Sequence, residues 1–338
     1  MTSRNRLIDA SAPGKLMVSG EYAVLEGAVA VVASVNVRAY ARWRSQAPDV
    51  SAGVGAGSPG PLGGSPQSGS LPPEAAQTRT LAEEAVGAVQ AELSIDASEL
   101  RRSGRKLGLG SSAAAAAAAA GAVLASRGEN LNDPKVQRRA FELALAGHKA
   151  IAPEGSGADV AAAALGGFVR FRLEQGQLAE AERIAWPAQV VTRVVWTGKE
   201  ARTSEFVRAV RSFEGRDAAG YRRIRDSLHE HAAEFAEAIG RGAGAEIIAA
   251  AAGYGQTVGT LGSLAVVSIM TPELQQIADL AARYGGGAKP SGAGGGDVAI
   301  AFFANDSDAL AFDAACVHGA LEVLDLVLGA PGVRPEPH

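Results

Sequence analysis

The stretch KLGLGSSAAAAAAAAGAVLA, at residues 106–125, most constrains what this chain can fold into. Alanine is the strongest helix former, so the segment from Ser111 to Arg127 is expected to be a helix. Glycine adopts backbone conformations that other residues avoid, and a helix N-terminus presents unpaired N–H groups with a positive partial charge. A glycine turn that leads into a helix therefore predicts either a tightly packed core helix or a cradle for an anion such as phosphate.

Two nucleotide-binding patterns can be compared with this stretch. It does not match the P-loop, because no Gly-Lys-Ser/Thr sequence follows the glycines. Gly108, Gly110 and Ala113 have the looser dinucleotide spacing, and Glu129 lies where a ribose-binding acid would be. That fold needs a buried apolar strand directly before the loop, whereas the residues there are ELRRSGRK. The sequence thus disfavours a dinucleotide loop and leaves a core helix or a phosphate cradle of another kind.

Composition limits the class of protein. The 338 residues suffice for two domains, and 47% hydrophobic with 20% charged residues is ordinary for a soluble globular protein. A net charge of -4 argues against a strongly basic nucleic-acid binder, and the single cysteine, Cys316, excludes an intramolecular disulfide. The N-terminus lacks the apolar core of a signal peptide, and Gly, Ser or charge interrupts every apolar stretch before membrane-spanning length. We expect a cytoplasmic protein without nucleic-acid or membrane partners.

The order of expected elements divides the chain into two α+β domains with a boundary at Pro187. Residues 51–73 are rich in Gly, Ser and Pro and predict a long flexible loop within the first domain. Hydrophobic periodicity predicts strands within 16–44 and at 168–173, 189–198 and 297–303. It predicts helices at 80–92, 111–127, 135–150, 159–165, 203–214, 217–239, 243–263, 272–284 and 306–328. A glycine-rich loop is expected at 288–296 and a frayed tail at 329–338.

Two further stretches accompany the glycine turn: APGKLMVSGEYAVLEGAVAV at 12–31 and KPSGAGGGDVAIAF at 289–302. Glycines this dense sacrifice chain entropy, usually for close approach of backbone to backbone or ligand. In this order, the three stretches resemble the signature motifs of the GHMP kinases. The resemblance implies an ATP-binding N-terminal domain like domain 2 of ribosomal protein S5 (residues 1–187) and a ferredoxin-like C-terminal domain (188–338). It also implies ATP and Mg²⁺ bound between them.

Two stretches resemble the phosphomevalonate kinase branch of that family: GSGADVAAAALGG at 155–167 and VVWTGKEARTSEFV at 194–207. The resemblance implies transfer of the γ-phosphoryl of ATP to 5-phosphomevalonate in the mevalonate route to isoprenoids. One departure from the family is that the basic residue usual before Gly-Ser-Gly is missing and Glu154 stands nearby. A phosphorylated acceptor prefers cationic neighbours. Lys149 or a distant arginine would have to compensate. A kinase for an unphosphorylated alcohol, such as mevalonate or a sugar, and a non-catalytic nucleotide-binding relative remain alternatives. The chain would be a monomer or a homodimer.

The resemblance also implies roles for individual residues. Lys15 would neutralise charge on the transferring phosphoryl group, and Asp159 would orient or deprotonate the acceptor, with an N-cap of the following helix as its alternative role. The triphosphate would contact Lys106, Gly108, Leu109, Gly110, Ser111, Ser112 and Ala113, and Ser112 would also be a Mg²⁺ ligand. The acceptor would contact Glu21, Tyr22, Ser156, Gly157, Thr203, Ser291, Gly292, Gly294 and Gly295.

Overall fold

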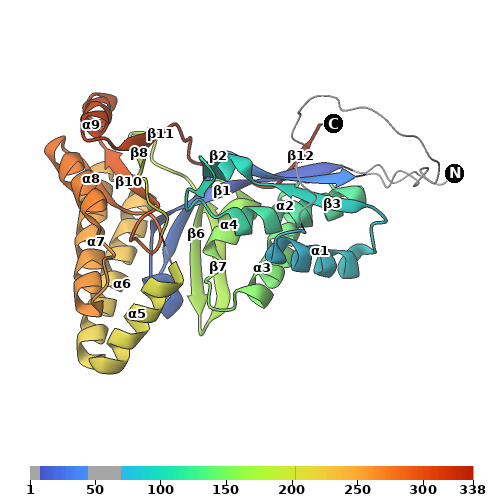
Figure 1. Cartoon of the computed structure of the whole chain (residues 1–338), viewed down its shortest axis with the longest axis horizontal. Helices are drawn as coiled ribbons and strands as arrows, with labels where there is room; N and C mark the ends of the chain where they lie inside the picture. The colour runs from blue at the N-terminus through green and yellow to red at the C-terminus, as the bar shows by residue number, and fades with distance from the viewer. Residues whose placement is uncertain (1–7, 45–69, 202, 338) are drawn as a thin grey trace, which may run out of the picture.

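The computed structural model describes residues 8–44, 70–201 and 203–337. Most of the predicted 51–73 loop lies outside the described residues. Figure 1 shows two long strands, β1 (Asp9–Ser19) and β2 (Ala30–Arg44), which extend along the molecule. Helices α5 to α9 gather at one end of the molecule and α1 to α3 toward the other. None of the described helices is long and apolar enough to cross a membrane.

An antiparallel sheet forms the first domain, in the strand order β12-β1-β2-β6-β7 with β3 also paired to β2. Its other strands are β3 (Glu92–Asp96), β6 (Phe168–Glu174), β7 (Gln177–Ile184) and β12 (Arg334–Glu336). Its helices are α1 (Pro73–Val86), α2 (Ser111–Ser126), α3 (Pro134–Ile151) and α4 (Ala158–Leu165). A short exposed hairpin, β4 (Arg101–Arg102) with β5 (Arg105–Lys106), precedes the glycine turn, and two 3-10 helices span Ala23–Glu26 and Ser98–Leu100.

The alanines of α2 allow close packing in the core of this domain. Every residue of α2 from Ala113 to Ser126 is buried, and the helix contacts both β1 and β2. A Cβ atom at Gly121 would overlap the side chain of Val333, which precedes β12. The predicted core helix is therefore confirmed, and its small residues let a strand and a returning segment lie directly against it.

The second domain is built on a four-stranded antiparallel sheet in the order β11-β8-β10-β9. The strands are β8 (Val191–Trp196), β9 (Gly287–Pro290), β10 (Val298–Phe303) and β11 (Glu322–Leu324). The helices are α5 (Thr203–Arg216), α6 (Ala218–Arg241), α7 (Gly244–Ala265), α8 (Pro272–Arg283) and α9 (Asp306–His318). The described helices follow the predicted order, whereas the sequence did not predict β3, β7, β9, β11 or β12. The boundary at Pro187 stays a prediction.

Several predicted elements differ from the structure. The helix predicted at 80–92 begins already at Pro73, whose fixed φ suits the first helical turn, and β3 follows it. The helix predicted at 306–328 ends at His318, because Ala320 has a left-handed φ of 57° and the chain then forms β11. The predicted loop at 288–296 begins within β9. These segments are rich in Ala, Val or Gly, and hydrophobic periodicity alone does not distinguish helix from strand in such short runs.

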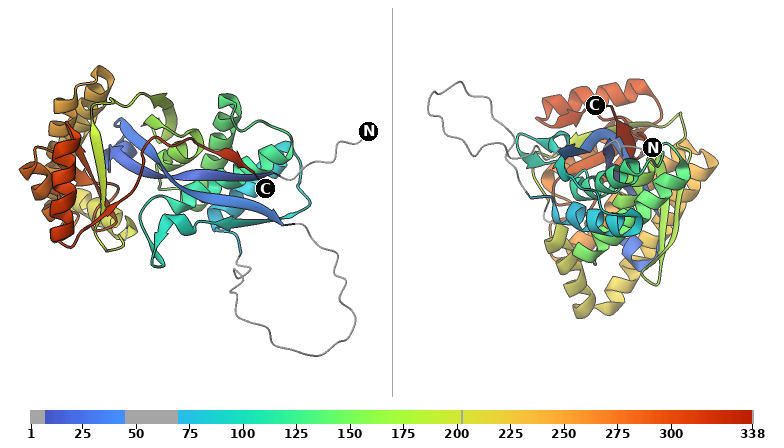
Figure 2. Two further views of the ribbon diagram at one scale, coloured as in Figure 1. Left: turned by 90° about the horizontal axis from the view of Figure 1, so that it is seen from above. Right: turned by 90° about the vertical axis from the view of Figure 1, so that its right-hand side faces the viewer.

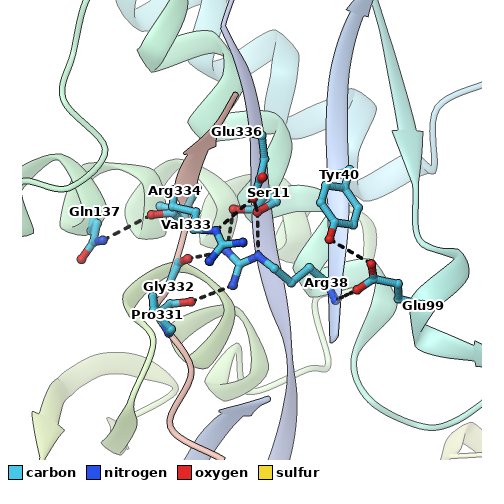
Figure 3. Close-up of polar contacts among 10 residues, drawn as sticks. All are labelled: Ser11, Arg38, Tyr40, Glu99, Gln137, Pro331, Gly332, Val333, Arg334 and Glu336. Atoms are coloured by element: carbon cyan, nitrogen blue, oxygen red, sulfur yellow. Dashed lines mark hydrogen bonds and ion pairs between the residues drawn. The ribbon is translucent and has the colours of Figure 1, made fainter. Parts of the chain in front are cut away.

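The predicted frayed tail is also wrong, since it contains β12, which pairs with β1 in the sheet of the first domain. Figure 2 shows this C-terminal segment running along β1. The buried guanidinium of Arg38, in β2, links this C-terminal segment to β1 through hydrogen bonds (Figure 3). It donates hydrogen bonds to the hydroxyl and carbonyl of Ser11 on β1 and to the carbonyls of Pro331 and Gly332 before β12. Distant ends of the chain thus complete one sheet.

Candidate active site

The three motif stretches meet where the two domains join. From β1, the Lys15 amide donates to the carbonyl of Leu109 in the glycine turn at 2.8 Å. Two residues later on the same strand, the Met17 amide donates to the Ser291 hydroxyl in the third stretch at 2.9 Å. The first stretch therefore bridges the other two, which are about 180 residues apart in the sequence.

The glycine loop, residues 107–110, ends at the N-terminus of α2. Its last residue, Gly110, is the N-cap, with φ 73° and no side-chain hydrogen bond to the first turn. The first N–H groups of α2, from Ser111 onward, therefore keep the arrangement that binds anions. Because a Cβ at Gly110 would lie 2.7 Å from Cγ of Lys15, the loop backbone and the lysine side chain are in close contact.

Asp297, which follows the glycines of the third stretch, also lies against the glycine loop, where a Cβ at Gly108 would overlap its carboxylate. The carboxylate accepts a hydrogen bond from the Ala201 amide at 3.0 Å. Burial raises the pKa of the Asp297 carboxyl, while that hydrogen bond and the charges of Lys15 and Lys106 act in the opposite direction. Two lysines and a carboxylate therefore surround the loop.

A cavity of about 410 Å³ lies beside this loop at the domain junction; we call it the junction cavity. The first motif stretch, the segment around the N-terminus of α4, the start of α5 and the loop after β9 line it. Seven predicted residues share its wall: Lys15, Glu21, Tyr22, Ser156, Asp159, Thr203 and Gly292. Lys15 thus lies at both the glycine loop and the cavity. A cation in this position can stabilise negative charge on a group that passes between ligands bound at the two places.

Four predicted acceptor residues lie outside this wall. Gly157 is the N-cap of α4, and a side chain there would overlap Leu145. Gly294 and Gly295 pack against Ile269 and Phe206, respectively. Ser291 accepts the hydrogen bond from Met17 described above. These four residues therefore contribute to the backbone conformation of the loop after β9 and of the α4 N-terminus, and not to the cavity wall.

Asp159 lies in the first turn of α4, where its carboxylate accepts a hydrogen bond from the Val160 amide at 3.1 Å. The alternative of an N-cap role is wrong, since Gly157 is the N-cap. The local capping contact comes from the Ser156 hydroxyl, which accepts from the Ala158 amide at 3.2 Å. Asp159 is therefore half-buried at the cavity wall without a capping function.

The structure adds residues that the sequence did not single out. His148, in the last turn of α3, lines the junction cavity, and its buried Nδ1 has no hydrogen-bond partner among the described residues. Its spacing of four residues from the buried Ala144 is the signal that could have found it. Ser204 and Val207 of α5 also line the cavity. Ser204 and Val207 come from a helix of the second domain, whose position beside the cavity no local pattern predicts.

Glu154, the carboxylate near the position where a basic residue is missing, has a cationic partner. Arg211 of α5 lies 3.7 Å from it, and both side chains are exposed. Arg211 and Lys149 line a smaller cavity of about 270 Å³, which adjoins the junction cavity through shared residues such as Tyr22 and Glu154. The pairing offsets part of the negative charge that Glu154 brings near the junction cavity.

A second groove and the potential metal-ligating side chains add no further candidate site among the described residues. A larger groove of about 850 Å³ between α7 and α8 contains none of the predicted site residues, and Asp279 is its only charged lining residue. Among the described residues, no group of three or more His, Cys, Asp or Glu side chains could hold a metal ion.

Comparisons with known proteins agree with this geometry. A family model described as the GHMP kinases N terminal domain matches residues 77–167, and one described as GHMP kinases C terminal matches residues 226–316. The phosphomevalonate kinase of Streptomyces sp. (strain CL190) is 29% identical over 349 residues, which cover 89% of this chain and 91% of that protein.

Solved structures share the fold over nearly the whole chain. The Lin0012 protein from Listeria innocua has a TM-score of 0.81 at 23% identity, covering 98% of this chain and 100% of that one. Streptococcus pneumoniae phosphomevalonate kinase, in complex with phosphomevalonate and AMPPNP, has a TM-score of 0.74 at 21% identity, covering 95% and 99%. At these identities the likeness concerns the fold.

Proposed function

This chain belongs to the GHMP kinase family, whose two domain models match more than half of it, and we propose on that premise that it is an ATP-dependent phosphomevalonate kinase. It would transfer the γ-phosphoryl group of ATP to 5-phosphomevalonate and form 5-diphosphomevalonate, a step in isoprenoid biosynthesis. The observation that carries the proposal is the position of Lys15, which contacts the glycine loop and lines the junction cavity. The curated relative supports the choice of acceptor.

The residues divide the chemistry between them. The N–H groups at the start of α2 would bind the β- and γ-phosphates of ATP, and the Lys106 charge adds to that field. The glycines bring the loop backbone close to Lys15 and Asp297, since side chains at Gly108 or Gly110 would collide with Asp297 or Lys15. Mg²⁺, when bound, neutralises phosphate charge, and the Ser112 hydroxyl would be its ligand from this chain.

Lys15 and Asp159 would act on the transferring group and the acceptor. The Lys15 ammonium offsets negative charge on the phosphoryl group as it passes between the loop and the junction cavity. A phosphate acceptor is already ionised, so Asp159 would orient it; with an alcohol, Asp159 would take the proton instead. The ion pair of Glu154 with Arg211 reduces the electrostatic repulsion between Glu154 and an anionic acceptor in the cavity.

The test is a coupled ADP-release assay with phosphomevalonate, mevalonate and several sugars. We expect turnover with phosphomevalonate and little with the others. Turnover confined to unphosphorylated alcohols would contradict the proposed acceptor. Nucleotide binding without turnover of any acceptor would instead identify a non-catalytic relative.

A glycine substitution tests the nucleotide half of the proposal. Gly110→Ala is expected to raise the KM for ATP by about tenfold or more, because it strains a residue at φ 73° and displaces Lys15. The matched control is Gly104→Ala in the β4–β5 turn, where φ is 79° but nothing lies within 4 Å of the new Cβ. Equal effects of the two substitutions would show that backbone strain alone is responsible.

A further inference from the structure

A buried lysine begins the third motif stretch at the edge of the junction cavity. Lys289, in β9, has a fully buried side chain and forms an ion pair with Oε1 of Glu21, itself only 3% exposed. Its ammonium also donates to the carbonyls of Pro290 at 2.8 Å and Met17 at 3.4 Å. It lies 5.7 Å from the ring centre of Tyr254. Lys289 does not line the cavity, whereas Glu21 does.

The contacts of Glu21 fix the turn that forms one wall of the cavity. Its Oε1 accepts from the Gly292 amide at 3.4 Å, and its carbonyl accepts from the Tyr254 hydroxyl at 2.7 Å. The next residue, Tyr22, has a left-handed φ of 61° and donates its hydroxyl to the Ala293 carbonyl at 2.5 Å. The turn from the first domain is therefore held against the loop of the second at the side of Gly292 and Ala293.

Stability does not account for this pair. Removing two charges from water costs about as much as their attraction returns, so apolar residues of similar size often stabilise a protein equally well. Burial raises the pKa of the Glu21 carboxyl and lowers the pKa of the Lys289 ammonium, and each charge opposes the shift of the other. In addition, Glu21 Oε2 is buried without a hydrogen-bond partner among the described residues. An arrangement this unfavourable points to a role in the cavity.

We propose that Lys289 is a positioning residue for the acceptor, acting through Glu21. Its ammonium holds the Glu21 carboxylate, and with it the turn at Tyr22, in register with Gly292 and Ala293 across the domain junction. The two walls of the cavity are then set before the acceptor arrives, which lowers the ordering cost of binding. The inference rests on the proposed kinase activity, but it concerns the acceptor side, since Glu21 and Tyr22 line the junction cavity.

The test compares Lys289→Met with the double variant Glu21→Gln/Lys289→Met. The single variant leaves a buried carboxylate unpaired, so we expect a lower thermal midpoint and an acceptor KM raised about tenfold or more, with the ATP KM within about twofold of wild type. The double variant removes both charges, so the thermal midpoint should recover while the acceptor KM stays high. Lys135→Met, at an exposed position in α3, is the control and should change neither.

The outcomes separate positioning from mere packing. Recovery of both the thermal midpoint and the acceptor KM in the double variant would show a purely structural pair and overturn the proposal. Equal increases in the two KM values would also overturn it. If Lys289→Met fails to fold, the double variant alone decides between a raised and a normal acceptor KM. The measurements use whichever acceptor the wild type phosphorylates, so an incorrect assignment of phosphomevalonate would show in the wild-type assay and not in this comparison.

Discussion

Replacing Asp159 by alanine is expected to lower kcat by at least about a hundredfold, the lower end of what a positioned acid–base group contributes. The reason is its place at the wall of the junction cavity, in the first turn of α4, together with Lys15. Because Asp159 does not cap the helix, its removal should disturb the fold little. The measurement is steady-state kinetics with saturating ATP and acceptor.

The control for Asp159 is Asp306→Ala. Asp306 also lies in the first turn of a helix, α9, but is exposed and outside the junction cavity. Each substitution removes a negative charge near a helix N-terminus, worth about 0.3–1 kcal/mol of stability. Asp306→Ala should therefore reproduce the small stability loss and leave kcat unchanged. An unchanged kcat in Asp159→Ala would remove Asp159 from the mechanism.

Replacing Arg38 by methionine is expected to destabilise the protein by about 3 kcal/mol or more, because each buried acceptor left without a donor costs about 1–3 kcal/mol. Methionine fills part of the space but leaves the hydroxyl of Ser11 and the carbonyls of Ser11, Pro331 and Gly332 without their donor. Burial lowers the pKa of Arg38 to about 10, so the guanidinium still carries its charge at neutral pH. Urea unfolding curves give the change in the free energy of unfolding.

Arg42 on the same strand provides the comparison. Its ion pair with Asp96 is 3.4 Å long and about half exposed on both sides, and such pairs contribute about 1 kcal/mol or less. Arg42→Met should therefore have a small effect. If Arg38→Met were no more damaging than Arg42→Met, the buried network would not hold β12 in place. Hydrogen exchange at residues 331–336 would locate the loss directly.

The sequence predicted the parts of this molecule whose causes are local. The helix from Ser111 was expected because alanines propagate a helix. Lys15 and Asp159 were assigned to one reaction by the family resemblance and not by a local pattern, and both line the junction cavity. The prediction failed where the partner is distant. The strand at Arg334–Glu336 is only three residues long, and its pairing to β1 joins residues more than 300 positions apart.

The site shows the same division. Nothing near Lys289 in the sequence indicates that it is buried, because a lysine beside a glycine-rich segment is usually exposed. Its burial follows from Glu21, which lies 268 residues earlier. The sequence did not single out His148, because its environment comes from the start of α4 and from α5. Charged and buried groups are thus the part of the site that requires the three-dimensional structure.

The pairing of β12 with β1 bears on how the protein is made. The helices of the first domain all precede residue 166, yet the outer edge of β1 at Asp9–Ser11 gains its partner only once residues 334–336 have been synthesised. Until then the edge presents open N–H and C=O groups of the kind that pair with other chains. A chain cut before residue 334 is therefore expected to associate with other chains or with chaperones more readily than the chain that contains β12.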